Sequence, residues 1–205
     1  MSSGVAGECL TTRSALAAAL PLLTRHAVVC ANGHISRWAC ALGDRPDQFY
    51  MIGSMGLASS IGLGIALVAP ERPVCVIDGD GNLLMNLGSL AMVGALAPQR
   101  FLHLVLDNGA YASTGNQATI SRRVALEEIA RAAGYRCTAR VRDAEALVEW
   151  LGRFAVASGP ALLLIETVPD DGGPAPRIPL GPRALAARMQ AALTAGNSSA
   201  RAERS

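Results

Sequence analysis

The chain has 205 residues, 51% of them hydrophobic and 17% charged, with a net charge of +2. This length is sufficient for one domain with a substantial core. The small net charge, without a run of basic residues, gives no electrostatic basis for nucleic-acid binding. No apolar run is long enough to span a membrane. Five cysteines without a CxxC pair argue against a disulfide framework and favour a reducing, cytoplasmic location.

The N-terminal part predicts a helix followed by a strand. Residues 1–10 are expected to be a flexible terminus. The Ala-rich segment Thr12–Arg25 predicts a helix, and Pro21 should disturb its last turn. Ala27–Ala31 is apolar and short, which predicts a buried strand.

A polar turn, Asn32-Gly33, follows this strand and leads into a loop that contains His34. An ordinary tight turn and a ligand contact at the strand end both remain open for Asn32 and Gly33. For His34 the alternatives are a solvated loop side chain and a contact to a ligand.

The next segment begins with a polar loop, Asp44–Phe49, and continues into a glycine-rich turn, Gly53-Ser54-Met55-Gly56. The residues after this turn, Leu57–Val68, are small and apolar on all sides. Such a pattern is typical of a helix packed between a sheet and a further partner.

The centre of the chain predicts a strand-helix-strand unit. The runs Val74–Ile77 and Phe101–Leu106 are apolar and β-branched, and Leu83–Leu96 between them has helical spacing. Strands joined in this way are almost always parallel, so the polar turns that follow them share the carboxyl edge of one sheet. We therefore expect Asp80 and Asn108 to lie close together, at the edge where open α/β sheets bind ligands.

Oxygen donors without Cys or His at this edge suit Mg²⁺ or Ca²⁺ better than zinc. Asp80 offers a carboxylate and Asn108 a neutral carbonyl oxygen. Mg²⁺ with so few protein ligands usually completes its shell with phosphate oxygens and water. The N–H groups of Gly81 and Asn82, at the start of a helix, form an anion site. The alternative is a plain turn, with Asn108 capping the loop that follows.

The C-terminal part predicts further α/β elements and no second domain. We expect one domain over residues 11–195 and a disordered tail over 196–205. The expected elements are a polar loop over Ala110–Arg123, a helix Leu126–Ala133, a strand within Tyr135–Val141, a helix Ala144–Ala157, a strand Ala161–Val168, a proline-rich arm Pro169–Pro182 and a helix Arg183–Ala195.

One long spacing narrows the function. Gly79-Asp80-Gly81 is followed by 26 residues and then by Asn108. This resembles the GDG-to-Asn signature of thiamine diphosphate enzymes. The flanks, 53–64 and 107–117, resemble the phosphonopyruvate and sulfopyruvate decarboxylase group, and the resemblance extends from about Thr12 to Leu193. It implies a three-layer α/β/α fold with a mainly parallel sheet, namely the diphosphate domain of these enzymes.

The resemblance also assigns roles to residues. It implies a Mg²⁺ site formed by Asp80, Asn108 and the carbonyl of Ala110. Met55 would wedge between the two cofactor rings and the Gly53 carbonyl would accept from the pyrimidine amine, although Met55 as plain core is the alternative. Ser113 and Thr114 would contact the anionic group of the substrate or cap the loop. The implied cofactor-binding residues are Asn32, Gly33, Gly53, Ser54, Met55, Gly79, Asp80, Gly81, Asn82, Asn108, Ala110 and Tyr111.

The chemistry of this family needs a second domain that binds the aminopyrimidine and supplies a glutamate. We find motifs for the diphosphate half only, so we expect a hetero-oligomer with a separate pyrimidine-domain subunit, as in two-subunit sulfopyruvate decarboxylases. The chain would then be the β-type subunit of a 2-oxo acid decarboxylase. One alternative is a subunit of an acetolactate synthase-like carboligase. A second is a nucleotide-binding or regulatory subunit, although the GxGxxG and GxxxxGK[ST] motifs are absent. A third is a non-catalytic interaction protein.

Overall fold

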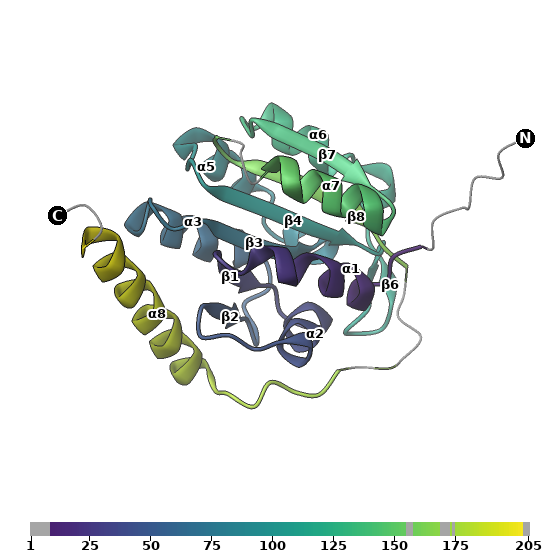
Figure 1. Cartoon of the computed structure of the whole chain (residues 1–205). Helices are drawn as coiled ribbons and strands as arrows, with labels where there is room; N and C mark the ends of the chain where they lie inside the picture. Colours follow the sequence, from purple (N-terminus) through teal and green to yellow (C-terminus); the bar gives the residue numbers. More distant parts are fainter. Residues whose placement is uncertain (1–8, 155–157, 169–172, 174, 203–205) are drawn as a thin grey trace, which may run out of the picture.

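The central feature of the fold is a six-stranded parallel sheet with the strand order β2-β1-β3-β4-β8-β7 (Figure 1). We analysed a computed structural model that describes residues 9–154, 158–168, 173 and 175–202, with side-chain surroundings described as far as residue 195. The strands are β1 Ala27–Cys30, β2 Gln48–Tyr50, β3 Val74–Gly79, β4 Phe101–Asp107, β7 Cys137–Val141 and β8 Ala161–Glu166.

Helices cover both faces of this sheet. Helices α1, α2 and α7 form one layer, and α3, α5 and α6 form the other (Figure 1). The predicted three-layer α/β/α fold with a mainly parallel sheet is confirmed. The helices are α1 Thr12–Ala19, α2 His34–Leu42, α3 Ala58–Val68, α4 Asp80–Leu84, α5 Gly88–Leu96, α6 Leu126–Ala132, α7 Ala144–Phe154 and α8 Pro182–Ala202, with the 3₁₀ turns η1 Leu20–Leu23 and η2 Ser121–Arg123.

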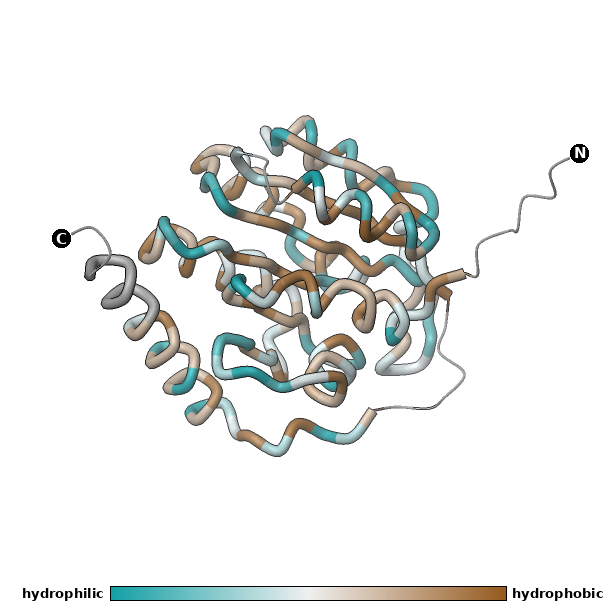
Figure 2. The backbone as a smooth tube through the Cα atoms, in the orientation of Figure 1, coloured by the Kyte–Doolittle hydropathy of each residue, from teal (hydrophilic) through white to brown (hydrophobic). Residues whose placement is uncertain are grey.

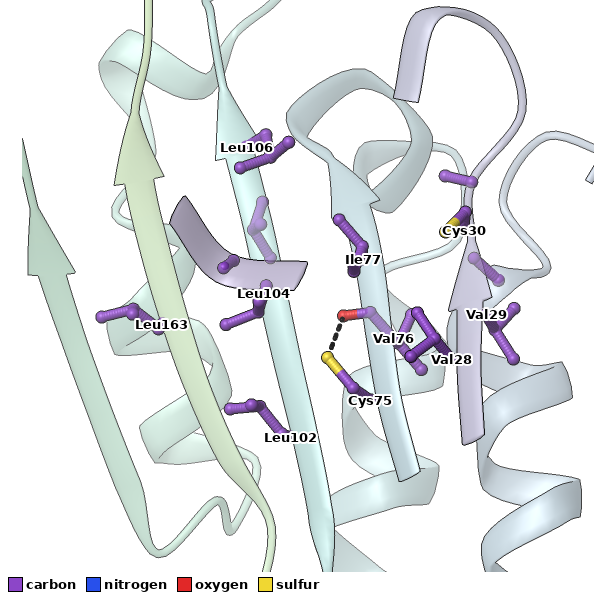
Figure 3. Packing of buried hydrophobic residues seen from close by; sticks show 14 of the residues in the cluster. Val28, Val29, Cys30, Cys75, Val76, Ile77, Leu102, Leu104, Leu106 and Leu163 are labelled. Atoms are coloured by element: carbon purple, nitrogen blue, oxygen red, sulfur yellow. Dashed lines mark hydrogen bonds between the residues drawn. The ribbon is translucent and has the colours of Figure 1, made fainter. Parts of the chain in front are cut away.

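The core lies along the inner strands, where hydrophobic residues concentrate (Figure 2). Every residue of β1 and β4 is buried, as expected for parallel strands covered on both faces. Figure 3 shows side chains from β1, β3, β4 and β8 packed together. Cys30 and Cys75 belong to this core, where burial raises the pKa of both thiols. All five cysteines are free.

The N-terminal helix is shorter than predicted. Its regular part ends at Ala19, and Pro21 lies in the 3₁₀ turn η1 that follows. Leu10, which the sequence places in a flexible terminus, is buried, and its carbonyl accepts from the N–H of Val168. The ordered domain therefore includes Leu10, and residues 1–8 lie outside the described part.

Helix α2 was missed from the sequence, where His34 was expected in a loop. His34 instead begins the helix after Gly33, which has φ +89° and offers no side-chain cap. The start of α2 is fixed by Ser36, whose Oγ donates to the carbonyls of Cys30 (2.9 Å) and Ala31 (2.7 Å) at the end of β1. Because this contact comes from a residue inside the helix and not from an N-cap side chain, no sequence signal precedes the helix.

The single helix predicted over Leu83–Leu96 is wrong, because the chain forms two helices, α4 and α5, joined by a turn. In that turn Asn86 Nδ2 donates to the Gly56 carbonyl (3.1 Å), and Ser89 Oγ donates to the Asn86 carbonyl (2.8 Å). These side-chain bonds compete with the regular helical bonds.

The polar segment predicted as a loop over Ala110–Arg123 contains a short antiparallel hairpin. Its strands are β5 Ala110–Tyr111 and β6 Gln117–Ala118. The 3₁₀ turn η2 follows, and its Ser121 is buried. The hairpin thereby returns residues 119–121 to the end of β4.

The C-terminal helix α8 is longer than predicted and continues to Ala202, so the expected disordered tail is wrong for residues 196–202. It lies beside the edge strand β2 (Figure 1). Arg188 attaches it there through Asp44 (2.7 Å) and the carbonyl of Gln48 (2.8 Å). Within the predicted proline-rich arm, residues 169–172 and 174 lie outside the described part, as do 155–157 of the predicted helix after Ala144 and 203–205 of the tail.

Candidate functional site

Two polar turns meet at the carboxyl edge of the sheet, as predicted. Strands β3 and β4 are adjacent and parallel, with Gly79 opposite Leu106. The next residues along the two strands are Asp80, which begins α4, and Asp107, which ends β4. Both side chains are buried, with exposed fractions of 2% and 0%. The edge therefore carries two neighbouring buried carboxyl groups.

Asp80 is held by a hydroxyl group. Thr119 Oγ1 donates to Asp80 Oδ2 over 2.5 Å. Burial raises the pKa of Asp80, and the negative charge of Asp107 raises it further, while the hydrogen bond from Thr119 acts in the opposite direction. A divalent cation beside this carboxylate would compensate the cost of burying its charge.

A second hydroxyl connects this bond to Asp107. Thr119 Oγ1 lies 2.9 Å from Ser121 Oγ, which donates to Asp107 Oδ1 over 2.7 Å. The other carboxylate oxygen, Asp107 Oδ2, is buried and has no hydrogen-bond partner among the described residues. The sequence alone did not reveal Asp107, Thr119 and Ser121 as site residues. No local motif includes Thr119 or Ser121, because only the hairpin brings their hydroxyls to the edge.

The turn after β4 is tied to Asp80 through the same threonine. The Thr119 N–H donates to the carbonyl of Gly109 (2.9 Å), so the turn and the Asp80 carboxylate lie on either side of Thr119. Asn108 Oδ1 accepts from the N–H of Ala110 (2.9 Å), which is the capping role considered above. An amide oxygen has a second lone pair, so this bond leaves capacity for a cation.

Tyr111 and Gly81 are brought into contact. A Cβ atom at Gly81 would lie 2.5 Å from Tyr111 Cε1, so only glycine allows the tyrosine ring to pack over the first turn of α4. The hairpin and the helix start thus form two sides of one site.

The loop Gly53–Gly56 approaches the same helix from β2. Asn82 Oδ1 accepts from the N–H of Gly56 over 2.8 Å. Ser54 has φ +57°, a conformation that costs energy for a residue other than glycine and is concentrated at functional sites. The Met55 side chain is 38% exposed, so the alternative interpretation of Met55 as plain core is wrong.

The turn after β1 forms a further wall. Asn32 Oδ1 is buried without a hydrogen-bond partner in the described part of the chain. A Cβ atom at Gly33 would lie 3.1 Å from Ser113 Oγ, so this turn lies against the hairpin loop. Thr114 next to it has a capping role, since its hydroxyl donates to the carbonyl of Tyr111 (3.1 Å).

These donors fit a magnesium-bound diphosphate. The edge offers a buried carboxylate, an amide oxygen and the first N–H groups of α4, which are the ligands expected for Mg²⁺ and phosphate. The unpartnered oxygens of Asn32 and Asp107 provide acceptors for a metal-bound water or a further donor. The residues that the structure describes hold no group of three His, Cys, Asp or Glu side chains arranged for a metal. A cation here would need oxygens from the bound diphosphate.

Comparisons with known proteins point to one family. Residues 31–165 match the family described as thiamine pyrophosphate enzyme, C-terminal TPP binding domain. The chain is 45% identical over 170 residues, 82% of its length, to a phosphonopyruvate decarboxylase of Streptomyces viridochromogenes. It is 55% identical over 92 residues, 44% of its length, to sulfopyruvate decarboxylase subunit beta of Methanocaldococcus jannaschii.

The match covers only part of each relative. The chain spans 42% of the Streptomyces protein and 48% of the Methanocaldococcus subunit. Among solved structures, benzoylformate decarboxylase from Polynucleobacter necessarius superposes with a TM-score of 0.64 at 14% identity, over 82% of this chain and 35% of that one. At this identity the superposition shows the shared fold. In the described residues no helix is both long and apolar enough to cross a membrane.

Proposed function

Because this chain belongs to the family of thiamine pyrophosphate enzymes through their C-terminal cofactor-binding domain, we propose that it is the diphosphate- and Mg²⁺-binding subunit of a 2-oxo acid decarboxylase. We assign phosphonopyruvate or sulfopyruvate as the substrate, on the strength of the relatives that carry these names. The five free thiols and the family support a reducing, cytoplasmic location.

One observation supports the proposal above all. The Gly79–Asn82 turn starts a helix at the carboxyl edge of β3, and the turn after β4 packs against it through Tyr111 and Gly81. A helix N-terminus beside a buried carboxylate is suited to a diphosphate that shares a divalent cation with the protein.

Three residues would hold the metal. These are Asp80 and Asn108 through their side chains and Ala110 through its carbonyl. The Ala110 N–H donates to Asn108 Oδ1 and not to β6. The N–H and C=O groups of one strand residue point to the same side, so the Ala110 carbonyl also faces away from β6. The hydrogen bond from Thr119 would hold the Asp80 carboxylate in position to bind the metal.

The remaining residues would bind and shape the cofactor. We assign the diphosphate to the N–H groups at the start of α4, with Asn32 on the opposite wall. The exposed loop carries Met55, which would support the cofactor between its rings, and the Gly53 carbonyl, which would accept from its amine. When bound, thiamine diphosphate supplies the electron sink for loss of carbon dioxide. The cofactor contacts are assigned to Asn32, Gly33, Gly53, Ser54, Met55, Gly79, Asp80, Gly81, Asn82, Asn108, Ala110 and Tyr111.

The pyrimidine-binding half of the site would come from a separate subunit, making the enzyme a hetero-oligomer. The name subunit beta, carried by several relatives, supports a partner chain. The exposed position of Met55 is consistent with a cofactor that lies between two chains.

The test uses the native complex, purified through a tag on this chain and supplied with thiamine diphosphate and Mg²⁺. We expect release of carbon dioxide and an aldehyde from phosphonopyruvate or sulfopyruvate, and none from the separated chain. Pyruvate serves as the third substrate, with analysis of condensation products. A complex that yields only acetolactate-type products would favour the carboligase, and one that turns over none of these acids would refute the proposal.

A further inference from the structure

A row of buried polar side chains lies beneath the site, and three of its members, Tyr135, His103 and Asp78, have no role in the function proposed so far. Tyr135 OH lies 3.2 Å from His103 Nδ1, and His103 Nε2 lies 3.2 Å from Asp78 Oδ2. Asp78 Oδ1 accepts from Asn82 Nδ2 over 2.5 Å, and Asn82 Oδ1 accepts from the Gly56 N–H over 2.8 Å. His103 and Asp78 are both fully buried. The row ends on the loop that carries Met55.

Strand register explains why the pair meets. His103 on β4 lies opposite Val76, two residues before Asp78 on β3, so both polar side chains project from the same face of the sheet. That face is covered by α3, because a Cβ atom at Gly62 would lie 2.2 Å from Val76 Cγ2. The polar row is therefore enclosed between the sheet and the helical layer, away from solvent.

Packing alone does not account for a buried acid and histidine. Replacing such a pair by hydrophobic residues of similar volume is often neutral or stabilising. The remaining hydrogen bonds of Asp78 go to the start of α4. There Asp78 Oδ1 accepts both from the Gly79 N–H (2.9 Å) and from the Asn82 amide. One carboxylate thus grips two residues of the diphosphate turn.

The donors and acceptors fix the orientation of the Asn82 amide within the row. A backbone N–H can only donate, so the Asn82 oxygen faces Gly56 and its NH₂ group faces Asp78. On its other side, Asp78 pairs with His103 through Oδ2 and Nε2. The Tyr135 hydroxyl, which can donate or accept, pairs with Nδ1 on the other side of the ring. Each member fixes the orientation of the next, from Tyr135 to Gly56.

We propose that Asp78 and His103 are positioning residues, which fix the Asn82 amide and through it hold the Gly53–Gly56 loop against the start of α4. This role rests on the proposed function, since the loop would contact the cofactor rings while α4 would contact its diphosphate. The row would then keep the two ends of the cofactor site at a constant separation.

The test compares four versions of the native complex, the wild type and three variants, with and without the cofactor. His103→Leu removes the donor to Asp78, and His103→Gln restores an N–H at the position of Nε2. Leu104→Ala, at the neighbouring fully buried core residue on the same strand, is the matched control for a general loss of stability. Thermal melting and circular dichroism establish that every variant is folded.

Two readouts separate positioning from packing. The first is hydrogen exchange at the Gly56 amide without cofactor, which should accelerate about tenfold or more in His103→Leu. The second is affinity for thiamine diphosphate in saturating Mg²⁺, which should fall by a similar factor. His103→Gln should restore both to within about threefold of wild type, and Leu104→Ala should change neither beyond its effect on global exchange.

The proposal is overturned if the Gly56 exchange rate and the cofactor affinity of His103→Leu match those of Leu104→Ala. It is also overturned if His103→Gln fails to restore the exchange rate and the affinity. A wild-type complex that does not bind thiamine diphosphate would instead refute the proposed function. The exchange readout needs no cofactor, so it still decides whether the row holds the loop.

Discussion

Thr119 Oγ1 donates a 2.5 Å hydrogen bond to Asp80 Oδ2, although 39 residues separate the two along the chain. The bond joins the β5–β6 hairpin to the start of α4. Thr119 also connects to Asp107 through Ser121, so one threonine links both carboxyl groups at the sheet edge. The position of the Asp80 carboxylate therefore depends on a residue that no motif includes.

Asp80→Ala should abolish Mg²⁺-dependent binding of thiamine diphosphate, because it removes the carboxylate proposed as a metal ligand. We expect affinity to fall by more than about 100-fold. Titration calorimetry with and without Mg²⁺ measures the change. Asp44→Ala, at the opposite edge of the sheet beside Arg188, is the control and should bind normally. Unchanged affinity in Asp80→Ala would refute the metal role.

Thr119→Val should weaken Mg²⁺ binding while the chain remains folded, since valine matches threonine in shape but cannot donate to Asp80. Removing a partner that orients a metal ligand typically costs about 10- to 100-fold in metal affinity. Thr119→Ser keeps the hydroxyl and should recover most of the affinity. Equal Mg²⁺ affinity in the valine and serine variants would exclude an orienting role.

Met55→Ala should slow turnover more than it weakens cofactor binding, because the exposed side chain is proposed to set the cofactor's shape. A misplacement of about 1 Å can cost about 100-fold in rate. Steady-state kinetics and calorimetry on the native complex separate the two effects. Met92→Ala, at an exposed methionine on α5, serves as the control. A larger loss in binding than in turnover would contradict the proposed role of Met55 in shaping the cofactor.

His26 should make the fold sensitive to acid. Burial, reinforced by the positive charges of Arg45 and Arg72, lowers the pKa of His26 from 6.5 to about 4. The unfolded chain then binds a proton below pH 6.5 that the folded chain does not bind until about pH 4. The free energy of unfolding therefore falls as the pH falls through this window, by at most about 3 kcal/mol from this group.

Denaturant titrations at several values between pH 7.5 and pH 4 test this sensitivity. His26→Gln cannot titrate, so its stability should decline less steeply over the same window. The carboxyl groups contribute equally to both proteins and cancel in the comparison. Parallel stability curves for the two proteins would contradict the prediction.

Local patterns in the sequence were sufficient to predict the parallel sheet and the two polar turns at its carboxyl edge. Buried parallel strands give uninterrupted apolar runs, so Val74–Ile77 and Phe101–Leu106 were recognisable as β3 and β4. The right-handed crossover then placed Asp80 and the end of β4 at one edge. Helix α2 was missed because Gly33 provides no side-chain cap before it.

Tertiary structure alone decided how the site is held together. The break between α4 and α5 follows from Asn86 reaching the Gly56 carbonyl. The bond from Thr119 to Asp80 follows from the hairpin, and the pairing of Asp78 with His103 follows from strand register. Polar side chains buried by distant segments must satisfy one another. Their partners are set by which segments meet in space, and the order of residues along the chain does not encode that locally.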